Sequence, residues 1–205
     1  MPSLYLASKS PRRRELLTTI GVTDFEVMPV GMADVLTFVE GDEEQLPGES
    51  AENYVIRTAR EKALAAIAKI RAEGREPAPV LAADTVVISD GIVLGKPADR
   101  DEARRFMQRL SGGTHEVRTA VWVGTDDEHL TNAVSVSRVT FTSLSEEQIE
   151  RYIATDEPYD KAGGYGIQGL AGLFIACIEG SYTGIMGLPV FETGNLLRPL
   201  GLTAV

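Results

Sequence analysis

The chain has 205 residues, of which 30 are acidic and 20 are basic, so its formal net charge is −10 at pH 7. A domain of this length buries roughly 70% of its unfolded surface and needs no disulfide or metal ion for stability. The acidic excess disfavours the broad basic surface through which proteins bind nucleic acid. Any anion site is therefore expected to be local, and no nucleic-acid partner is expected.

Two features of the sequence bear on the compartment. Cys177 is the single cysteine, so it has no partner for an internal disulfide. No charged and then apolar leader opens the sequence, and no apolar run approaches the roughly 20 residues that cross a bilayer. We therefore expect a soluble, cytoplasmic protein with no membrane partner.

Strand-like apolar runs alternate with capped helical patterns along the chain, which predicts an α/β protein. The first strand is expected over residues 3–7. Ser10 predicts the cap of the next helix, with Pro11 as its first residue and Gly21 just beyond its end. Residues 29–49 contain Pro, Gly and acidic side chains without a period and predict a long loop, a kind of segment that is often functional.

The alternation of strands and helices continues through the rest of the chain. Ser50 predicts the cap of a long second helix, and a β-branched strand over residues 80–88 is followed by a hairpin turn at SDG. The apolar stripe of the second helix is Val55, Ala59, Ala63, Ile67 and Ile70. The further predictions are a helix to Leu110 with Asp99 and Glu102 as its capping box, strands over 116–124 and 133–142, a helix to Ala154 with Ser145 and Gln148 as its capping box, a Gly-rich stretch and a short C-terminal helix.

The stretch SKSPRRRELL, residues 8–17, places three consecutive arginines in this acidic chain. The first N–H groups of a helix lack intrahelical partners and, together with the helix dipole, favour an anion. Arg12 and Arg13 fall in the first turn and add positive charge where that anion would lie. The pattern indicates a phosphate site. The alternative is that the arginines are solvated or form ion pairs with acidic loops.

Asp84 interrupts the apolar run LAADTVV. A carboxylate buried there would be costly without partners, so it lies at a strand end, is hydrogen-bonded or faces a functional cleft. Ligands of α/β sheets usually bind at strand ends. The alternative for Asp84 is an exposed residue that starts a turn, and Lys62 and Lys96, taken singly, have the simpler interpretation of surface lysines.

Taken together, these segments resemble the Maf family of nucleoside triphosphate pyrophosphatases. The resemblance runs from residue 4 to about residue 198 in the family's order, through LYLASKSPRRRELL, YVIRTAREKA, AADTVV, GKP, LSGGTHEV and DKAGGYGIQG. One difference is a longer, divergent loop between Phe25 and Glu49. The family's loop glutamate therefore falls on Glu43 or Glu44.

The resemblance also implies a fold. We expect one domain over residues 1–205, with a mixed β-sheet and surrounding helices in two lobes that form a cleft, like the inosine triphosphate pyrophosphatases. Homodimers are common in such proteins, so a homodimer is a possible assembly. Two cellular tasks fit the resemblance, housecleaning of modified nucleotides and control of nucleotide pools.

The reaction implied by the resemblance is hydrolysis of a nucleoside triphosphate between its α and β phosphates, with a divalent metal ion. Asp84 would be the general base that orients or deprotonates the attacking water, and a ligand of the metal. Lys62 and Lys96 would be catalytic cations that neutralise the triphosphate. The remaining site residues would be Ser8, Arg12 and Arg13 at the phosphates, Arg12, Thr85 and Gln168 at the base, and Glu43 or Glu44 as a second carboxylate for Mg²⁺ or Mn²⁺.

Gln168, in YGIQG, is similar to the form found in the pyrimidine-selective branch of the family, which acts on dTTP and UTP. Uracil and thymine present a carbonyl acceptor beside an N–H donor, and a side-chain amide matches both, whereas a glutamate only accepts. Two alternatives remain: an enzyme with another base preference, such as 7-methylguanosine or inosine triphosphate, and a nucleotide-sensing regulator of cell division that binds without turnover. The retained carboxylate and lysines favour an enzyme.

Overall fold

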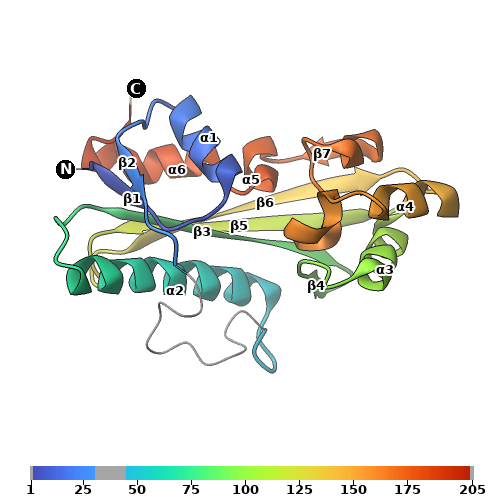
Figure 1. The fold of residues 1–205 in the computed structure, drawn as a ribbon, viewed down its shortest axis with the longest axis horizontal. Coiled ribbons are helices and arrows are strands. Elements are labelled where there is room, and N and C mark those ends of the chain that lie inside the picture. Colours follow the sequence, from blue (N-terminus) through green and yellow to red (C-terminus); the bar gives the residue numbers. More distant parts are fainter. Residues whose placement is uncertain (1, 31–44, 204–205) are drawn as a thin grey trace. The chain divides into compact units, whose positions relative to one another are not determined.

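The structure, a computed structural model, describes residues 2–30 and 45–203. The predicted metal ligands Glu43 and Glu44 lie outside the described residues. The main elements (Figure 1) are β1 (Leu4–Leu6), α1 (Pro11–Thr19), β2 (Phe25–Val27), α2 (Ala51–Ala72), β3 (Val80–Ser89), β4 (Ile92–Leu94), α3 (Arg100–Leu110), β5 (Thr114–Gly124), β6 (Thr131–Phe141), α4 (Glu146–Ile153), β7 (Ile175–Glu179), α5 (Tyr182–Met186) and α6 (Val190–Leu197). Short 3₁₀ helices are η2 (Glu157–Asp160), η3 (Ala162–Gly164), η4 (Leu170–Leu173) and η5 (Arg198–Leu200).

The strands form a mixed sheet in the order β2-β1-β3-β5-β6-β7, with β4 paired to β3. β1 pairs in parallel with both β2 and β3, whereas the β3–β4 and β6–β7 pairs are antiparallel. Parallel neighbours need a crossover connection, which α1 supplies between β1 and β2 and α2 supplies between the β2 and β3 segments. The prediction of a mixed β-sheet with surrounding helices is confirmed.

The described chain divides into two compact units. The first consists of Met1–Asp84, Thr119–Ser135 and Gly187–Val205, and the second of Thr85–Arg118 and Val136–Met186. The divisions fall within β3, β5 and β6, so each of these strands contributes to both units. The single domain over residues 1–205, with two lobes, stays a prediction.

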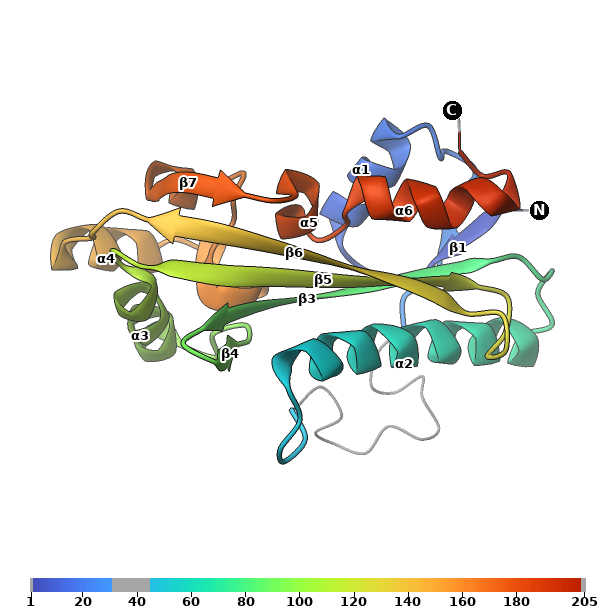
Figure 2. The same cartoon turned by 180° about the vertical axis from the view of Figure 1, so that it is seen from behind.

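In the first unit, α2 lies along one side of β1 and the start of β3, and α1 and α6 lie on the other side (Figures 1 and 2). Every residue of the predicted α2 stripe is buried. Two of these residues, Ala59 and Ala63, are alanines, whose small side chains allow the helix to approach the strands closely. One core cluster of this unit consists of Tyr5, Ala7, Met28, Ala63, Ala66, Ile67, Ile70, Val80 and Ala82.

In the second unit, α3 and α4 lie side by side (Figure 2) and cover the ends of β5 and β6 with aromatic and aliphatic side chains. Phe141 contacts the rings of His115 and Tyr165 edge to face, at centroid distances of 5.2 and 5.0 Å. None of the described helices of either unit is long and apolar enough to cross a membrane. The core of the second unit contains Val87, Leu94, Ala103, Met107, Leu110, Val117, Val139, Phe141, Ile149, Tyr152, Ile153, Tyr165, Ala171 and Phe174.

The predicted helix caps are present with one correction. Ser10 caps α1 and Ser50 caps α2 through bonds from the backbone N–H three residues on, and Ser145 with Gln148 forms the full capping box of α4. Asp99 accepts the N–H of Glu102 as predicted. The Glu102 carboxylate, however, accepts the N–H of Ala98 instead of that of Asp99, so the predicted reciprocal capping box of α3 is wrong in its second half.

Two short strands, β2 and β7, were absent from the sequence prediction. β2 has three residues, too few to show a period, and it exists because β1 offers it a parallel partner. β7 has mostly exposed or half-buried side chains and follows the Gly-rich stretch, so its apolar signal is weak. The hairpin turn is confirmed at Asp90 and Gly91, whose φ angles of 49° and 76° belong to a turn with two left-handed residues.

Candidate active site

Asp84 lies on β3 opposite helix α2. Val80 and Ala82 belong to the core cluster under this helix, and side chains two residues apart on a strand share a face, so Asp84 points the same way. Nζ of Lys62 lies 2.8 Å from Oδ1 of the carboxylate, and Oγ1 of Thr58 donates to Oδ2 at 2.6 Å. Thr58 and Lys62 are four residues apart, on one face of the helix, and together they satisfy both carboxylate oxygens.

The environment of Asp84 keeps it ionised. Its side chain is 17% exposed, and burial alone would raise the pKa of the carboxyl. The ammonium of Lys62 and the hydrogen bonds from Lys62 and Thr58 outweigh burial, and the charge of Arg13 adds to them. The pKa of Asp84 is therefore below its usual range, and the group is a carboxylate at neutral pH.

The first turn of α1 forms a second polar cluster of the same unit. Ser8 is 7% exposed, and its Oγ accepts from Nη1 of Arg13 at 3.1 Å and from the N–H of Ser10 at 3.2 Å. Nε of Arg13 donates to the carbonyl of Gly187 at 2.7 Å. These bonds fix the guanidinium beside the N-terminus of α1, where the helix dipole favours an anion.

Arg13 and Asp84 share one electrostatic environment. Burial lowers the pKa of the Arg13 guanidinium, the charge of Asp84 opposes this effect, and the charge of Arg12 adds to it. A guanidinium remains protonated in proteins, so Arg13 is a fixed positive charge. The structure therefore brings together Ser8, Arg12, Arg13, Lys62 and Asp84, five of the predicted site residues, in the first unit.

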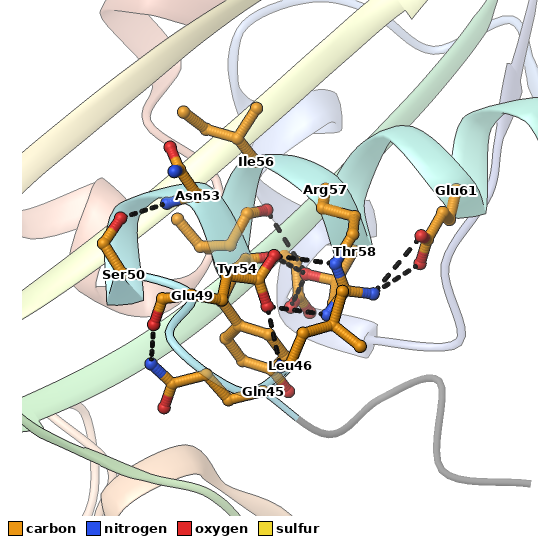
Figure 3. A network of polar contacts seen from close by, with 12 residues as sticks. Gln45, Leu46, Glu49, Ser50, Asn53, Tyr54, Ile56, Arg57, Thr58 and Glu61 are labelled. Carbon is orange, nitrogen blue, oxygen red and sulfur yellow. Dashed lines mark hydrogen bonds and ion pairs between the residues drawn. The ribbon is translucent and has the colours of Figure 1, made fainter.

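A further polar network lies at the start of α2 (Figure 3). Arg57 contacts Glu49 through two parallel bonds, Nε to Oε1 at 2.8 Å and Nη2 to Oε2 at 2.9 Å, and reaches Glu61 at 3.2 Å. Glu49 also accepts the N–H of Leu46 at 3.0 Å. The bond from Arg57 is the main cause that lowers the pKa of Glu49. The network anchors residues 45–50 to the helix.

Thr58, Arg57 and Glu49 were not predicted from the sequence. The available signal for Thr58 was its position four residues before Lys62, which places both on one helix face. For Arg57 the signal was Glu61 at the same spacing. Glu49 gave no signal, because its contact with Arg57 depends on how the loop approaches the helix.

Lys96 and the Gly-rich stretch are joined in the second unit. The N–H of Gly163 donates to the carbonyl of Gly95, next to Lys96, at 2.9 Å. Gly163 has a φ of 71°, and a Cβ there would come within 2.8 Å of the Val87 side chain, so this close approach requires glycine. Lys96 and Gln168 are exposed. Of the predicted site residues, this unit contains Thr85, Lys96 and Gln168.

Thr85 directly follows Asp84 on β3, so their side chains point to opposite faces of the strand. This alternation separates Thr85 from the carboxylate and from the helix α2 side of the sheet. The predicted contact of Thr85 with the base would therefore lie on the face of β3 opposite to the Asp84 side chain.

The described residues fit a magnesium or manganese ion through Asp84. Each of its oxygens accepts one protein hydrogen bond and keeps acceptor capacity for a further partner. Mg²⁺ is usually held by one or two carboxylates together with substrate phosphates. No cluster of three or more His, Cys, Asp and Glu side chains suited to a metal occurs within residues 2–30 and 45–203. Of the predicted metal ligands, Asp84 is thus the one that lies within the described residues.

The fold and this cluster define a mixed α/β protein in which Arg13, in the first turn of α1, shares the electrostatic environment of an ionised carboxylate, Asp84. The profile of the family described as Maf-like protein matches residues 3–200, and the chain belongs to this family. The chain is 52% identical over 202 residues to the dTTP/UTP pyrophosphatase of Bordetella avium (strain 197N), covering 98% of this chain and 96% of that protein. It is 49% identical over 197 residues to the dTTP/UTP pyrophosphatase of Escherichia coli (strain K12), covering 96% and 92%.

Among solved structures, the chain matches the Ham1 protein of Staphylococcus aureus with a TM-score of 0.47 and 12% identity, over 96% of each chain. The HAM1 protein of Coxiella burnetii matches with a TM-score of 0.42 and 16% identity, over 69% of this chain and 73% of that one.

Proposed function

We propose that the protein hydrolyses dTTP and UTP to the nucleoside monophosphate and pyrophosphate, by attack of water between the α and β phosphates. Relatives that share about half of its residues over nearly the whole chain are named dTTP/UTP pyrophosphatase. The observation that carries the proposal is the carboxylate of Asp84, bonded to Thr58 and Lys62 and within the electrostatic reach of Arg13.

Asp84 orients the attacking water. Its lowered pKa makes it a weak base, and a side chain accepts protons efficiently only when its pKa lies near the working pH. The carboxylate therefore acts first by accepting a hydrogen bond from the water and directing its lone pair at phosphorus. When Lys62 turns toward the triphosphate, Asp84 loses part of its neutralising charge and becomes more basic.

The cations of the site hold the triphosphate and stabilise the charge of the transition state. Ser8, Arg12 and Arg13 bind phosphate oxygens at the N-terminus of α1. Lys62 and Lys96 neutralise the remaining charge. A triphosphate carries several negative charges, so several cations from different elements are needed.

Gln168 reads the base. Its exposed amide offers one donor and one acceptor, which match the O4 acceptor and N3–H donor of uracil and thymine. Arg12 and Thr85 are the other two residues proposed to contact the base. A glutamate at this position would only accept, which would suit the donor edge of guanine.

A divalent ion, Mg²⁺ or Mn²⁺, would be held by Asp84 and by Glu43 or Glu44. When bound, such an ion supplies positive charge to the phosphate oxygens. We also place the enzyme in the cytoplasm, because the exposed free thiol of Cys177 suits a reducing compartment. A homodimer stays a prediction.

A panel of nucleotides, scored by pyrophosphate release with and without chelator, tests the proposal. We expect dTTP and UTP to be hydrolysed well, CTP and purine triphosphates poorly, and activity to stop in chelator and return with Mg²⁺ or Mn²⁺. A preference for 7-methylguanosine or inosine triphosphate would replace the substrate. Tight binding of dTTP without pyrophosphate release would favour a nucleotide-sensing regulator.

A further inference from the structure

The Gly-rich segment that carries Gln168 is bonded to the carboxylate of Glu157 in the second unit. This residue begins η2, and its Oε2 accepts the N–H of Leu170 at 2.7 Å. Its Oε1 accepts the N–H of Ala171 at 3.1 Å. The two N–H groups open the 3₁₀ helix η4, which has no capping side chain of its own, so Glu157 satisfies both from a distant part of the chain.

The same carboxylate also fixes the other end of the segment through Tyr152. The phenol oxygen of Tyr152 lies 3.1 Å from Oε1 of Glu157 and 3.2 Å from the carbonyl of Gly164, so its proton is shared between the two acceptors. Burial, followed by the charge of Glu157, raises the pKa of Tyr152, which keeps the phenol a donor at neutral pH. Residues 164–171 are thus held at both ends, and Gln168 lies between them.

Two glycines allow the main chain to pass close to these groups. A Cβ at Gly169 would lie 2.3 Å from Oε2 of Glu157, although its φ of −107° suits any residue. A Cβ at Gly166 would lie 2.9 Å from Cε of Lys161, whose Nζ donates to the Glu157 carbonyl at 2.8 Å. A Cβ at either position would therefore displace the end of the facing side chain, Lys161 or Glu157, from its present bonds.

We infer that Glu157 is a positioning residue that sets the location of Gln168 and thereby the choice of base. The inference rests on the proposed function. Gln168 is exposed, so its location depends on the main chain on either side of it. A side-chain amide discriminates between bases only while its donor and acceptor stay aligned with the base edge, and Glu157 holds the adjacent N–H groups by charge-assisted bonds.

The experiment is Glu157→Gln, with kcat and KM measured for dTTP, UTP, CTP and GTP. The amide is nearly isosteric but loses the charge and one acceptor, so the turn at residues 169–171 loosens. We expect the ratio of kcat/KM for dTTP to that for CTP to fall about 10- to 100-fold, the range of one or two charge-assisted hydrogen bonds. The loss should appear mainly in the KM for dTTP and UTP, while kcat/KM for CTP and GTP changes less than about threefold.

Two further variants test the geometry separately. Gly169→Ala directs its methyl group at the Glu157 carboxylate, so it should reproduce the selectivity loss, and combined with Glu157→Gln it should add little. Glu157→Asp keeps the charge and should restore part of the selectivity. The matched control is Glu147→Gln on α4, whose side chain is 73% exposed and pairs with Arg151 on the surface. It should leave every rate unchanged.

A role in folding alone would give a different result. Rates on all four nucleotides would then fall together with the folded fraction measured by thermal unfolding, and such a parallel fall would overturn the inference. So would an unchanged dTTP to CTP ratio in both Glu157→Gln and Gly169→Ala. If Glu157→Gln does not fold, the ratio of kcat/KM for dTTP to that for CTP in Gly169→Ala alone decides whether the inference holds. A wild-type protein without pyrimidine preference would instead contradict the proposed function itself.

Discussion

Nζ of Lys62 lies 2.8 Å from Oδ1 of Asp84, although 22 residues separate them in the chain. The side chains are 21% and 17% exposed, so the pair is largely removed from water while remaining accessible to a ligand. A lysine that neutralises a carboxylate before substrate binds is already in place to neutralise a phosphate afterwards. Under the proposed function, the pair thus gives the site an ionised carboxylate and a cation that turns toward the nucleotide.

Asp84→Asn should leave the fold intact and lower turnover of dTTP by about 10²- to 10⁴-fold, the usual contribution of a general base. The amide keeps the shape of the carboxyl but lacks the charge that orients water and binds a metal. Pyrophosphate release and thermal unfolding measure the two effects. The matched control, Asp127→Asn, alters a side chain that is 63% exposed and pairs with Arg60 on the surface. Near wild-type turnover by Asp84→Asn would make Asp84 a structural residue.

Thr58→Val should lower kcat/KM for dTTP about tenfold, because it removes a hydrogen bond to an ionised group. Thr58 is 2% exposed, and valine has its shape, so the packing is preserved. The bond is one of the causes that lower the pKa of Asp84, so without it the pKa rises toward the usual value. The acid limb of the rate profile should therefore move to higher pH.

Thr58→Ser keeps the hydroxyl and serves as the control for this pH shift. It should retain the wild-type acid limb, even if the lost methyl group lowers the melting temperature. An identical acid limb in Thr58→Val would show that the hydroxyl does not act on the carboxylate.

His115 should make the protein less stable as the pH falls from about 6.5 to about 4. Burial lowers the pKa of this imidazole to about 4, from 6.5 in the unfolded chain. Across this window the unfolded state binds a proton that the folded state does not, so the free energy of unfolding decreases by roughly 3 kcal/mol in total. Above pH 6.5 the imidazole is neutral in the folded and the unfolded state, so this loss of stability does not occur there.

Urea unfolding of the wild type and of His115→Gln, at intervals between pH 7 and pH 4, measures this effect. Glutamine keeps a polar group near the hydroxyl of Tyr165, which lies 2.7 Å from Nε2, but it does not titrate. The difference in the free energy of unfolding between the wild type and His115→Gln should shrink toward acid pH. A constant difference would exclude His115 as the cause.

Arg57 should be coupled more strongly to Glu49 than to Glu61. The Glu49 contact is two-pronged and its carboxylate is 10% exposed, whereas that of Glu61 is 33% exposed and belongs to a helical i,i+4 pair. Double-mutant cycles with Arg57→Met should give about 1–3 kcal/mol for Glu49→Gln and about 0.3–0.5 kcal/mol for Glu61→Gln. Equal coupling energies would contradict the geometry.

Local rules in the sequence predicted much of this fold. Ser10, Pro11 and Gly21 define α1 through capping alone, and the stripe of α2 follows from its helical period. β2 and β7 escaped prediction because each takes its conformation from a neighbouring strand. Short strands of this kind have too few residues to express a pattern of their own.

The candidate site, too, was predicted where a local rule applies and not where it depends on tertiary contacts. Asp84 was identified because a carboxylate in an apolar run demands partners, and the structure supplies them. The identity of one partner, Thr58, depends on how α2 crosses β3, which no local rule contains. The Glu157 carboxylate likewise accepts from Leu170 and Ala171, which lie 13 and 14 positions further along the chain. Both donors are backbone N–H groups, which carry no residue-specific signal.

The distribution of site residues over the two units has a consequence for divergence among relatives. Asp84, Lys62 and Thr58 belong to the first unit, whereas Gln168 and Glu157 belong to the second. Substitutions in residues 157–171 alter the surroundings of Gln168, the proposed reader of the base, and leave the bonds from Thr58 and Lys62 to the Asp84 carboxylate in place. Under the proposed function, the segment that carries Gln168 can therefore change in sequence without altering the groups that bond to the Asp84 carboxylate.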